Sequence, residues 1–142
     1  MIKDWLPAAI NLREDSGWGL KQSRRKIMIK LIVAGPRDYH DQENVFRHIH
    51  MFQGKFGIDE IISGGASGVD ALAEEYASLH QIPFKLFPAD WKKYGKAAGP
   101  IRNQQMAEYG NVLLAFDRGT KGTKNMIETA RRNHLRGFVV SI

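Results

Sequence analysis

From residue 27 to the end of the chain, short apolar runs alternate with segments whose apolar residues recur at helical spacing. The first apolar run covers residues 27–34, is broken only by Lys30 and stops at Gly35-Pro36-Arg37. Similar runs of strand character cover residues 59–63, 83–87, 112–116 and 137–142. Strands that alternate with helices are typical of a parallel sheet covered on both faces. The pattern predicts an α/β fold, a Rossmann-like three-layer sandwich with a parallel sheet of about five strands.

Helical periodicity fills the stretches between the predicted strands. The clearest stripe consists of Val69, Leu72, Ala73, Tyr76 and Ala77, which would share one face of a helix. The other expected helices run from an N-cap at Asp41 to Gly57, from Pro100 at the first helical position to about Tyr109, and from Thr123 to about His134. Residues 92–99 are expected to form an irregular basic loop.

The first 26 residues are expected to form an appendage or linker, and residues 27–142 one domain. The appendage has mixed polarity, and its range 6–12 would form at most two helical turns. Trp5 and Trp18 would cover an apolar patch of either the core or a partner. Four of the six residues 21–26 are basic, a run that favours a solvated linker over a nucleic-acid contact.

Composition and charge narrow the class of protein. A chain of 142 residues is long enough for one domain with a sizeable core. The lack of cysteine excludes disulfides and thiol nucleophiles, and the five histidines form no H-x-x-x-H pair, so no metal site is expected. No apolar run approaches the roughly 20 residues of a membrane span and no secretory signal is recognisable, so we expect no membrane partner and a cytoplasmic location. The formal net charge of +6 favours an anionic partner.

Two glycine-bearing loops each follow a predicted strand and open into a helical pattern. The first reads Ser63-Gly64-Gly65-Ala66-Ser67-Gly68-Val69-Asp70 and the second Gly119-Thr120-Lys121-Gly122-Thr123. Backbone without Cβ atoms can approach an anion closely, and the first N–H groups of a helix point at it. We therefore expect the amides of both loops to hold phosphate, with Ser67 and Thr123 capping their helices or donating hydroxyl hydrogen bonds. Neither loop matches the G-x-G-x-x-G fingerprint or the Walker phosphate loop, which disfavours NAD and ATPase functions, and no cofactor is expected.

Because the carboxyl ends of parallel strands meet at one edge of the sheet, the side chains that follow the strands are candidate site residues. Arg37 and Arg102 offer planar guanidinium groups that grip phosphate or carboxylate. Asp70 would repel a phosphate placed at the same spot, so it would contact sugar hydroxyls or cap backbone amides. Trp91 and Tyr94 would stack on a base, or Trp91 would instead seal the edge of the core. The expected ligand-binding residues are Gly35, Pro36, Arg37, Ser63, Gly64, Gly65, Ala66, Ser67, Gly68, Asp70, Asp90, Trp91, Arg102, Asn103, Gly119, Thr120, Gly122 and Thr123.

Several of these motifs together resemble the YspA-type branch of the SLOG superfamily. The motifs are Gly35-Pro36-Arg37, the first glycine loop, Phe87-Pro88-Ala89-Asp90-Trp91, the run Gly-Lys-Ala-Ala-Gly-Pro-Ile-Arg-Asn at 95–103 with Met106, and Gly122-Thr123. The resemblance spans residues 28–142 and implies a Rossmann-like fold with a site for a nucleotide or nucleotide-derived ligand. Related members include cytokinin-activating phosphoribohydrolases and the DNA-processing protein of natural transformation, which binds single-stranded DNA.

The resemblance to the phosphoribohydrolases is incomplete at the residues that carry their chemistry. Arg102 with Met106 looks like their R-K-x-x-M motif. Their P-G-G-x-G-T-x-x-E motif fails at its acid, because Met126 stands three residues after Thr123 and Glu128 is expected to turn away on the helix. The candidate catalytic residues are therefore Arg102, Asp70 and Asp90, with Asp117 as a further substitute for the missing acid.

Three functions are compatible with these features. The first is a sensor or processing domain that binds a nucleotide-derived small molecule. The second is an enzyme that hydrolyses the N-glycosidic bond of a nucleoside monophosphate. The third is a single-stranded nucleic-acid-binding module that uses the basic residues 21–26 and 92–96. The first is the expected function, a nucleic-acid partner is the less favoured alternative, and a homo-oligomer is compatible with all three.

Overall fold

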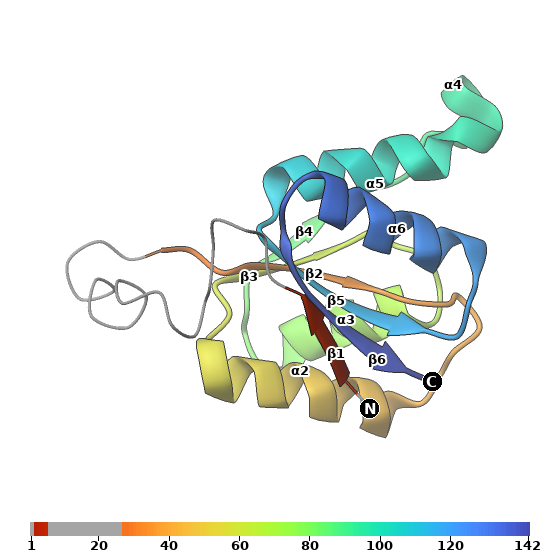
Figure 1. The fold of residues 1–142 in the computed structure, drawn as a ribbon. Coiled ribbons are helices and arrows are strands. Elements are labelled where there is room, and N and C mark those ends of the chain that lie inside the picture. The colour runs from red at the N-terminus through yellow and green to blue at the C-terminus, as the bar shows by residue number, and fades with distance from the viewer. Residues whose placement is uncertain (1, 6–26) are drawn as a thin grey trace.

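The computed structural model describes residues 2–5 and 27–142, and a six-stranded sheet forms its centre (Figure 1). The strands are β1 (Ile2–Trp5), β2 (Lys30–Ala34), β3 (Glu60–Ser63), β4 (Phe84–Leu86), β5 (Val112–Asp117) and β6 (Arg136–Ser141). They lie in the order β1-β6-β5-β2-β3-β4, and only the pair β1–β6 is antiparallel. The predicted α/β fold with five parallel strands is confirmed.

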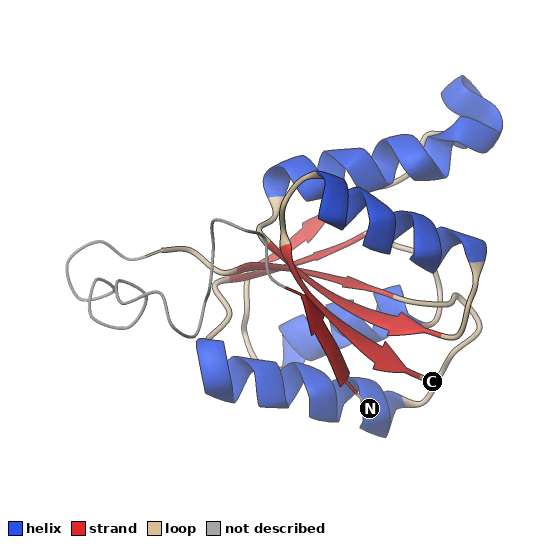
Figure 2. Cartoon of the chain, in the orientation of Figure 1, coloured by secondary structure: helices blue, strands red, loops and turns tan. Residues whose placement is uncertain are grey.

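Helices cover both faces of the sheet and complete the three layers (Figure 2). The helices α2 (Gln42–Phe56) and α3 (Val69–Leu79) pack on one face, and α5 (Ala98–Tyr109) and α6 (Lys121–Arg132) on the other. Successive side chains of β2 point to opposite faces of the sheet. Leu31 and Val33 pack in the core beneath α2 and α3, and Ile32 and Ala34 pack in the core beneath α5 and α6. The continuous apolar runs of the sequence are therefore strands buried on both faces.

The order of the parallel strands creates a switch point between β2 and β5. From β2 the chain moves outward through β3 and β4, then returns to β5 and β6 on the other side of β2. The loops after β2 and β5 therefore lead to helices on opposite faces of the sheet. Open α/β sheets bind their ligands in the crevice that such a divergence leaves.

The helices differ from the sequence prediction mainly at their starts. The expected loop at 92–99 is instead a short helix, α4 (Trp91–Tyr94), followed by a 3₁₀ turn (Gly95–Ala97) and the start of α5. Pro100 is the third residue of α5, where its missing N–H costs little because first-turn amides have no partner within the helix. Asp41 caps α2 as predicted, accepting a hydrogen bond from the Asn44 N–H at 3.0 Å. No helix within residues 2–5 and 27–142 combines the length and apolarity needed to span a membrane.

The strand β1 was not predicted from the sequence. It pairs with β6 from Ile2 opposite Val140 to Trp5 opposite Gly137. This pairing covers backbone groups that β6 would otherwise present at the edge of the sheet. The expectations for Trp18 and for the ranges 6–12 and 21–26 lie outside the described residues.

Candidate functional site

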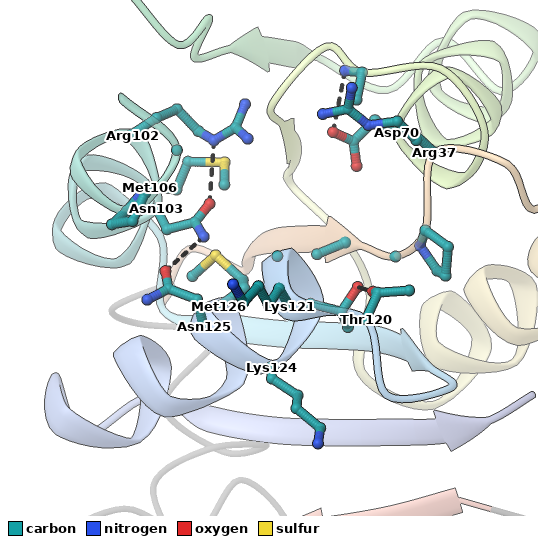
Figure 3. Close-up of a pocket in the computed structure, with 18 of the residues that line it drawn as sticks. Arg37, Asp70, Arg102, Asn103, Met106, Thr120, Lys121, Lys124, Asn125 and Met126 are labelled. Carbon is teal, nitrogen blue, oxygen red and sulfur yellow. Dashed lines mark hydrogen bonds between the residues drawn. The ribbon is translucent and has the colours of Figure 1, made fainter. Parts of the chain in front are cut away.

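An open cavity of about 890 Å³ lies at the carboxyl ends of β2 and β5, at the switch point of the sheet. Its lining comes from the loops after β2, β3 and β5 together with α5 and α6, and Figure 3 shows Arg102 on one side with Arg37 and Asp70 on the other. A volume of this size is within the range that small-molecule sites occupy. The loops that the sequence singled out therefore converge on one cavity.

Positive charge predominates around this cavity. Six cationic side chains line it, compared with three acidic ones. The cationic residues are Arg37, Lys96, Arg102, Arg118, Lys121 and Lys124, and the acidic ones are Asp38, Asp70 and Glu128. Low-dielectric walls around charges of one sign raise the local concentration of anions. Within the described part of the chain, no cluster of three or more histidine, aspartate or glutamate side chains could hold a metal ion.

Three amides of the first glycine loop, those of Gly65, Ala66 and Val69, are already bonded within the protein. The Ala66 N–H donates to the Asp70 carboxylate at 3.1 Å, and the Gly65 N–H donates to the Ser63 hydroxyl at 3.3 Å. The Val69 N–H donates to the Pro36 carbonyl at 3.3 Å. The expectation that this loop offers these amides to a phosphate is therefore wrong, because Asp70 and Ser63 occupy the place of the anion.

Two glycines of the first loop are required by backbone geometry. Gly65 and Gly68 have φ angles of 78° and 72°, which residues with a Cβ rarely adopt. A Cβ on Gly68 would lie 2.4 Å from the Pro36 carbonyl oxygen, so the loop after β3 packs directly on the loop after β2. The Ser67 hydroxyl strengthens the same contact by donating to the Arg37 carbonyl at 2.8 Å, and it does not cap α3. Gly68 and Ser67 thus fix the position of Arg37.

Asp70 has an unusual protonation equilibrium for an aspartate. Its side chain is 7% exposed, and this burial raises its pKa from 3.8 to about 6. The hydrogen bond from Ala66 and the positive charges of Arg102 and Arg37 oppose the rise without cancelling it. Burial also lowers the pKa of Arg102, an effect that the charge of Asp70 counteracts. The cavity therefore contains a carboxyl group that can exchange a proton near neutral pH.

Arg102 is anchored between two loops. Its Nη1 donates to the Gly64 carbonyl at 2.7 Å and more weakly to the Phe87 carbonyl at 3.4 Å. Its Nε donates to the Asn103 side-chain oxygen at 3.1 Å, and the Asn103 amide in turn donates to Asn125 at 2.8 Å. This chain fixes the plane of the guanidinium group and ties α5 to α6. Arg102 is consequently a rigid part of the cavity wall.

The second glycine loop differs because the first turn of α6 faces the cavity. Thr120 is the N-cap, with an extended backbone (φ −69°, ψ 149°), and its hydroxyl donates to the Thr123 hydroxyl at 3.0 Å. Thr123 is therefore not the cap that the sequence suggested. Only the Gly119 N–H of this loop is occupied, by the Asp117 carboxylate at 2.8 Å. The N–H groups of Lys121, Gly122 and Thr123 have no acceptor among the described residues, as is usual for a first helical turn.

Most of the residues predicted for the site line this cavity or a smaller hollow beside it. The predicted residues that line the cavity are Gly35, Pro36, Arg37, Ala66, Asp70, Trp91, Arg102, Asn103, Thr120, Gly122 and Thr123. Gly64, Gly65 and Ser67 line the smaller hollow. Ser63, Gly68, Asp90 and Gly119 line neither. Asp90 instead caps α4, accepting from the Lys93 N–H at 3.1 Å. Of the two aspartates predicted to be catalytic, Asp70 lines the cavity and Asp90 does not.

Sequence reasoning missed a group of polar residues on α6 and one arginine before it. Lys121, Lys124 and Glu128 lie at spacings of three and four residues, so they share one side of the helix. All three line the cavity, and the expectation that Glu128 turns away from the site is wrong. Arg118 pairs with Asp38 across the switch point. The helical spacing of the charges was visible in the sequence, whereas the side of α6 that faces the cavity was not.

Comparisons with known proteins agree with this architecture. The model of the YspA, cpYpsA-related SLOG family matches residues 29–94. The Gene 61 protein of Mycobacterium phage D29 is 31% identical over 114 residues, which cover 74% of this chain and 90% of that protein. DNA processing protein A (DprA) from Streptococcus pneumoniae has a similar fold, with a TM-score of 0.62 at 17% identity over 76% of this chain, and the chain spans about half (48%) of that structure. The chain belongs to the YspA, cpYpsA-related SLOG family.

Proposed function

We propose that the cavity binds a nucleotide or nucleotide-derived ligand whose phosphate lies at the N-terminus of α6. Membership of the SLOG family indicates a function related to nucleotides or nucleic acids. The observation that carries the more specific proposal is the first turn of α6, whose open amides and Lys121 border a cavity rich in cations. Helix amides and the helix dipole together favour a negatively charged ligand group at this position.

The first glycine loop has a different part in this proposal. Its Asp70 carboxylate borders the cavity and would repel a phosphate placed beside it. Carboxylates accept hydrogen bonds from hydroxyl groups, so Asp70 is suited to the sugar of the ligand. Arg37 and Arg102 lie on opposite sides of the cavity, where they offset the negative charge of the ligand (Figure 3). The protein acts as a sensor or processing domain for such a ligand.

The proposal is tested by removing one amide of α6 without further loss of charge. Lys121 is the first residue of the helix, where proline is well accepted, and Thr120 before it already has the extended backbone that proline requires. K121A removes the side-chain charge, and K121P removes the same charge together with the N–H group. Calorimetric titration with inorganic phosphate and nucleoside mono- and diphosphates should show K121P weaker than K121A by about 10-fold or more.

Two matched measurements make this result interpretable. Urea unfolding of both variants checks that the helix start is intact, and R47A, which removes an exposed arginine from α2 outside the cavity, controls for net charge. R47A should bind like the wild type. Equal affinities of K121P and K121A would contradict a phosphate at the α6 amides. Failure of every phosphate and nucleotide in the panel to bind would reject the proposed function.

A second function, hydrolysis of a nucleoside monophosphate, is favoured by the position and pKa of Asp70. The carboxyl borders the cavity and its pKa of about 6 allows proton exchange near neutral pH. In this reaction the bond between C1′ and the base nitrogen breaks, water supplies a hydroxyl group to C1′, and a proton goes to the base. Arg102 would stabilise the charge of the sugar phosphate.

Chromatography of the free base after incubation with each monophosphate tests this second function. Release that disappears in D70N but persists in E74Q would support it, since Glu74 is an exposed acid on the same helix outside the cavity. Release that persists in D70N would exclude Asp70 as the acid. If the protein binds a monophosphate tightly but releases no free base, only the binding function is supported.

A further inference from the structure

A second hollow of about 280 Å³ opens beside the cavity, between the loops that follow β3 and β4. The two spaces share Arg37, Ala66, Trp91 and Arg102 in their linings, so they lie next to each other. The remaining residues that line the hollow are Gly64, Gly65, Ser67, Leu86, Pro88 and Ala89. A ligand that reached from the cavity into the hollow would pass Arg37 and Arg102.

The hollow combines apolar side chains, which suit the face of a planar ring, with polar side chains, which suit its edge. Leu86 and Trp91 are 46% and 53% exposed, so two large apolar side chains border it while remaining accessible to solvent. Leu86 packs directly on Gly65, because a Cβ at position 65 would approach Leu86 Cδ1 to 2.6 Å. The position of the Leu86 side chain at the hollow thus depends on the absence of a side chain at position 65.

Two backbone amides beside the hollow are not available to a phosphate. The Gly65 and Ala66 amides, which would otherwise hold an anion, donate to the Ser63 hydroxyl and the Asp70 carboxylate. Arg102 borders the hollow, but its Nη1 is bonded to the carbonyls of Gly64 and Phe87. A guanidinium group held in this way offers its face and its remaining N–H groups, which suit stacking on a ring or bonding to its edge.

We infer that this hollow receives the base of the ligand, with Trp91 stacking on the ring. The inference rests on the proposed function, because it takes the phosphate to lie at α6. It implies that the ligand is a nucleotide with an intact base and that a simple sugar phosphate binds more weakly. Each end of the ligand then has its own compartment, and Arg37 and Arg102 lie where the two meet.

The test compares ligands with and without a base on variants of the full chain. AMP, CMP and ribose 5-phosphate are titrated into the wild type, W91A, W91F and Y94A. Tyr94 is the matched control, because it is an exposed aromatic residue of the same helix that lines neither space. The wild type should bind at least one monophosphate about 10-fold more tightly than ribose 5-phosphate, in keeping with the usual strength of base stacking.

The variants identify the source of that preference. W91A should lose most of the preference for the monophosphate while its affinity for ribose 5-phosphate stays within about 2-fold, W91F should retain most of it, and Y94A should match the wild type. L86A should reduce the preference as well, through a residue on the opposite loop.

Three outcomes would overturn the inference. Equal binding of monophosphates and ribose 5-phosphate by the wild type would show that no base compartment exists, even though the proposed phosphate site stands. Equal weakening of all ligands by W91A would give Trp91 a general structural role. Binding of single-stranded oligonucleotides alone, with none of the small phosphates, would reject both the inference and the proposed function in favour of a nucleic-acid partner.

Discussion

The two glycine-bearing loops occupy equivalent positions after parallel strands, yet they differ in whether their amides are already hydrogen-bonded within the protein. In the first loop, the Asp70 carboxylate and the Ser63 hydroxyl accept hydrogen bonds from the loop amides. In the second loop, Asp117 satisfies only Gly119, and the first turn of α6 stays open toward the cavity. One loop thus contains its own anion, while the other can accept one from a ligand.

This difference shows that glycine content does not by itself define a phosphate site. Gly65 and Gly68 are needed for positive φ angles and close backbone packing. Gly122 has no such requirement, since a Cβ there would meet nothing within 4 Å. The deciding feature is a carboxylate in the first turn of α3, which competes with any external anion for the loop amides.

The largest expected effect comes from replacing the packed glycine of the first loop. G68A should destabilise the protein by about 2–5 kcal/mol, because it combines an unfavourable φ with overlap against the backbone of Pro36 and Arg37. Urea unfolding measures the change. G122A on the second loop is the control, and its free energy of unfolding should stay within about 1 kcal/mol of the wild type or rise. Similar losses in both variants would remove the distinction between the loops.

The next effect concerns the internal anion of the first loop. Because the pKa of Asp70 rises from 3.8 to about 6 on folding, the folded state binds more protons between these pH values, and stability falls as pH increases through this window. The wild type should lose roughly 2 kcal/mol from this group between pH 4 and pH 7. Unfolding of D70N over the same range should lack this component, and E74Q should retain it. Parallel pH profiles for wild type and D70N would contradict the burial of this carboxylate.

The smallest expected effect comes from breaking the contact between the loops after β2 and β5. Arg118 pairs with Asp38, and their side chains are 37% and 70% exposed, so D38A should change stability by less than about 1 kcal/mol. It should raise affinity for inorganic phosphate by about 2–3-fold, because it removes a negative charge and releases Arg118 into the cavity. E43A, which removes an exposed acid of α2 outside the cavity, is the matched control. Equal gains in both variants would indicate a general charge effect.

Much of the fold was predictable because it depends on local pattern. The run at 27–34 and the stripe from Val69 to Ala77 gave a buried strand and an amphipathic helix, and both are present as β2 and α3. The antiparallel β1 was not predictable, since a short edge strand is selected by the open edge of β6. The start of α6 at Lys121 was also missed, because Thr123 was expected to cap the helix, whereas the structure has Thr120 at that position.

The candidate site was predictable in its location but less so in its chemistry. The motifs at Gly35-Pro36-Arg37, Arg102 and Gly122-Thr123 meet at one cavity, as parallel topology requires. Asp90 was assigned to the site because it follows a strand, yet its side chain caps α4. Glu128 was excluded because it was expected to turn away on the helix, but it shares a side with Lys124 and lines the cavity. Side-chain direction, rather than position after a strand, decided both cases.

The sequence by itself determined that the chain alternates strands with helices and that glycines and arginines gather at the carboxyl ends of those strands. Hydrophobic periodicity and turn residues act between neighbours in the chain, so they can be recognised without the fold. Only the tertiary structure decided which amides remain open, because Asp70 folds back onto Ala66, while the first turn of α6 has no such partner in the part of the chain that the structure describes. Competition for a backbone amide depends on which acceptor comes within about 3 Å of it, and that distance is set by packing between elements.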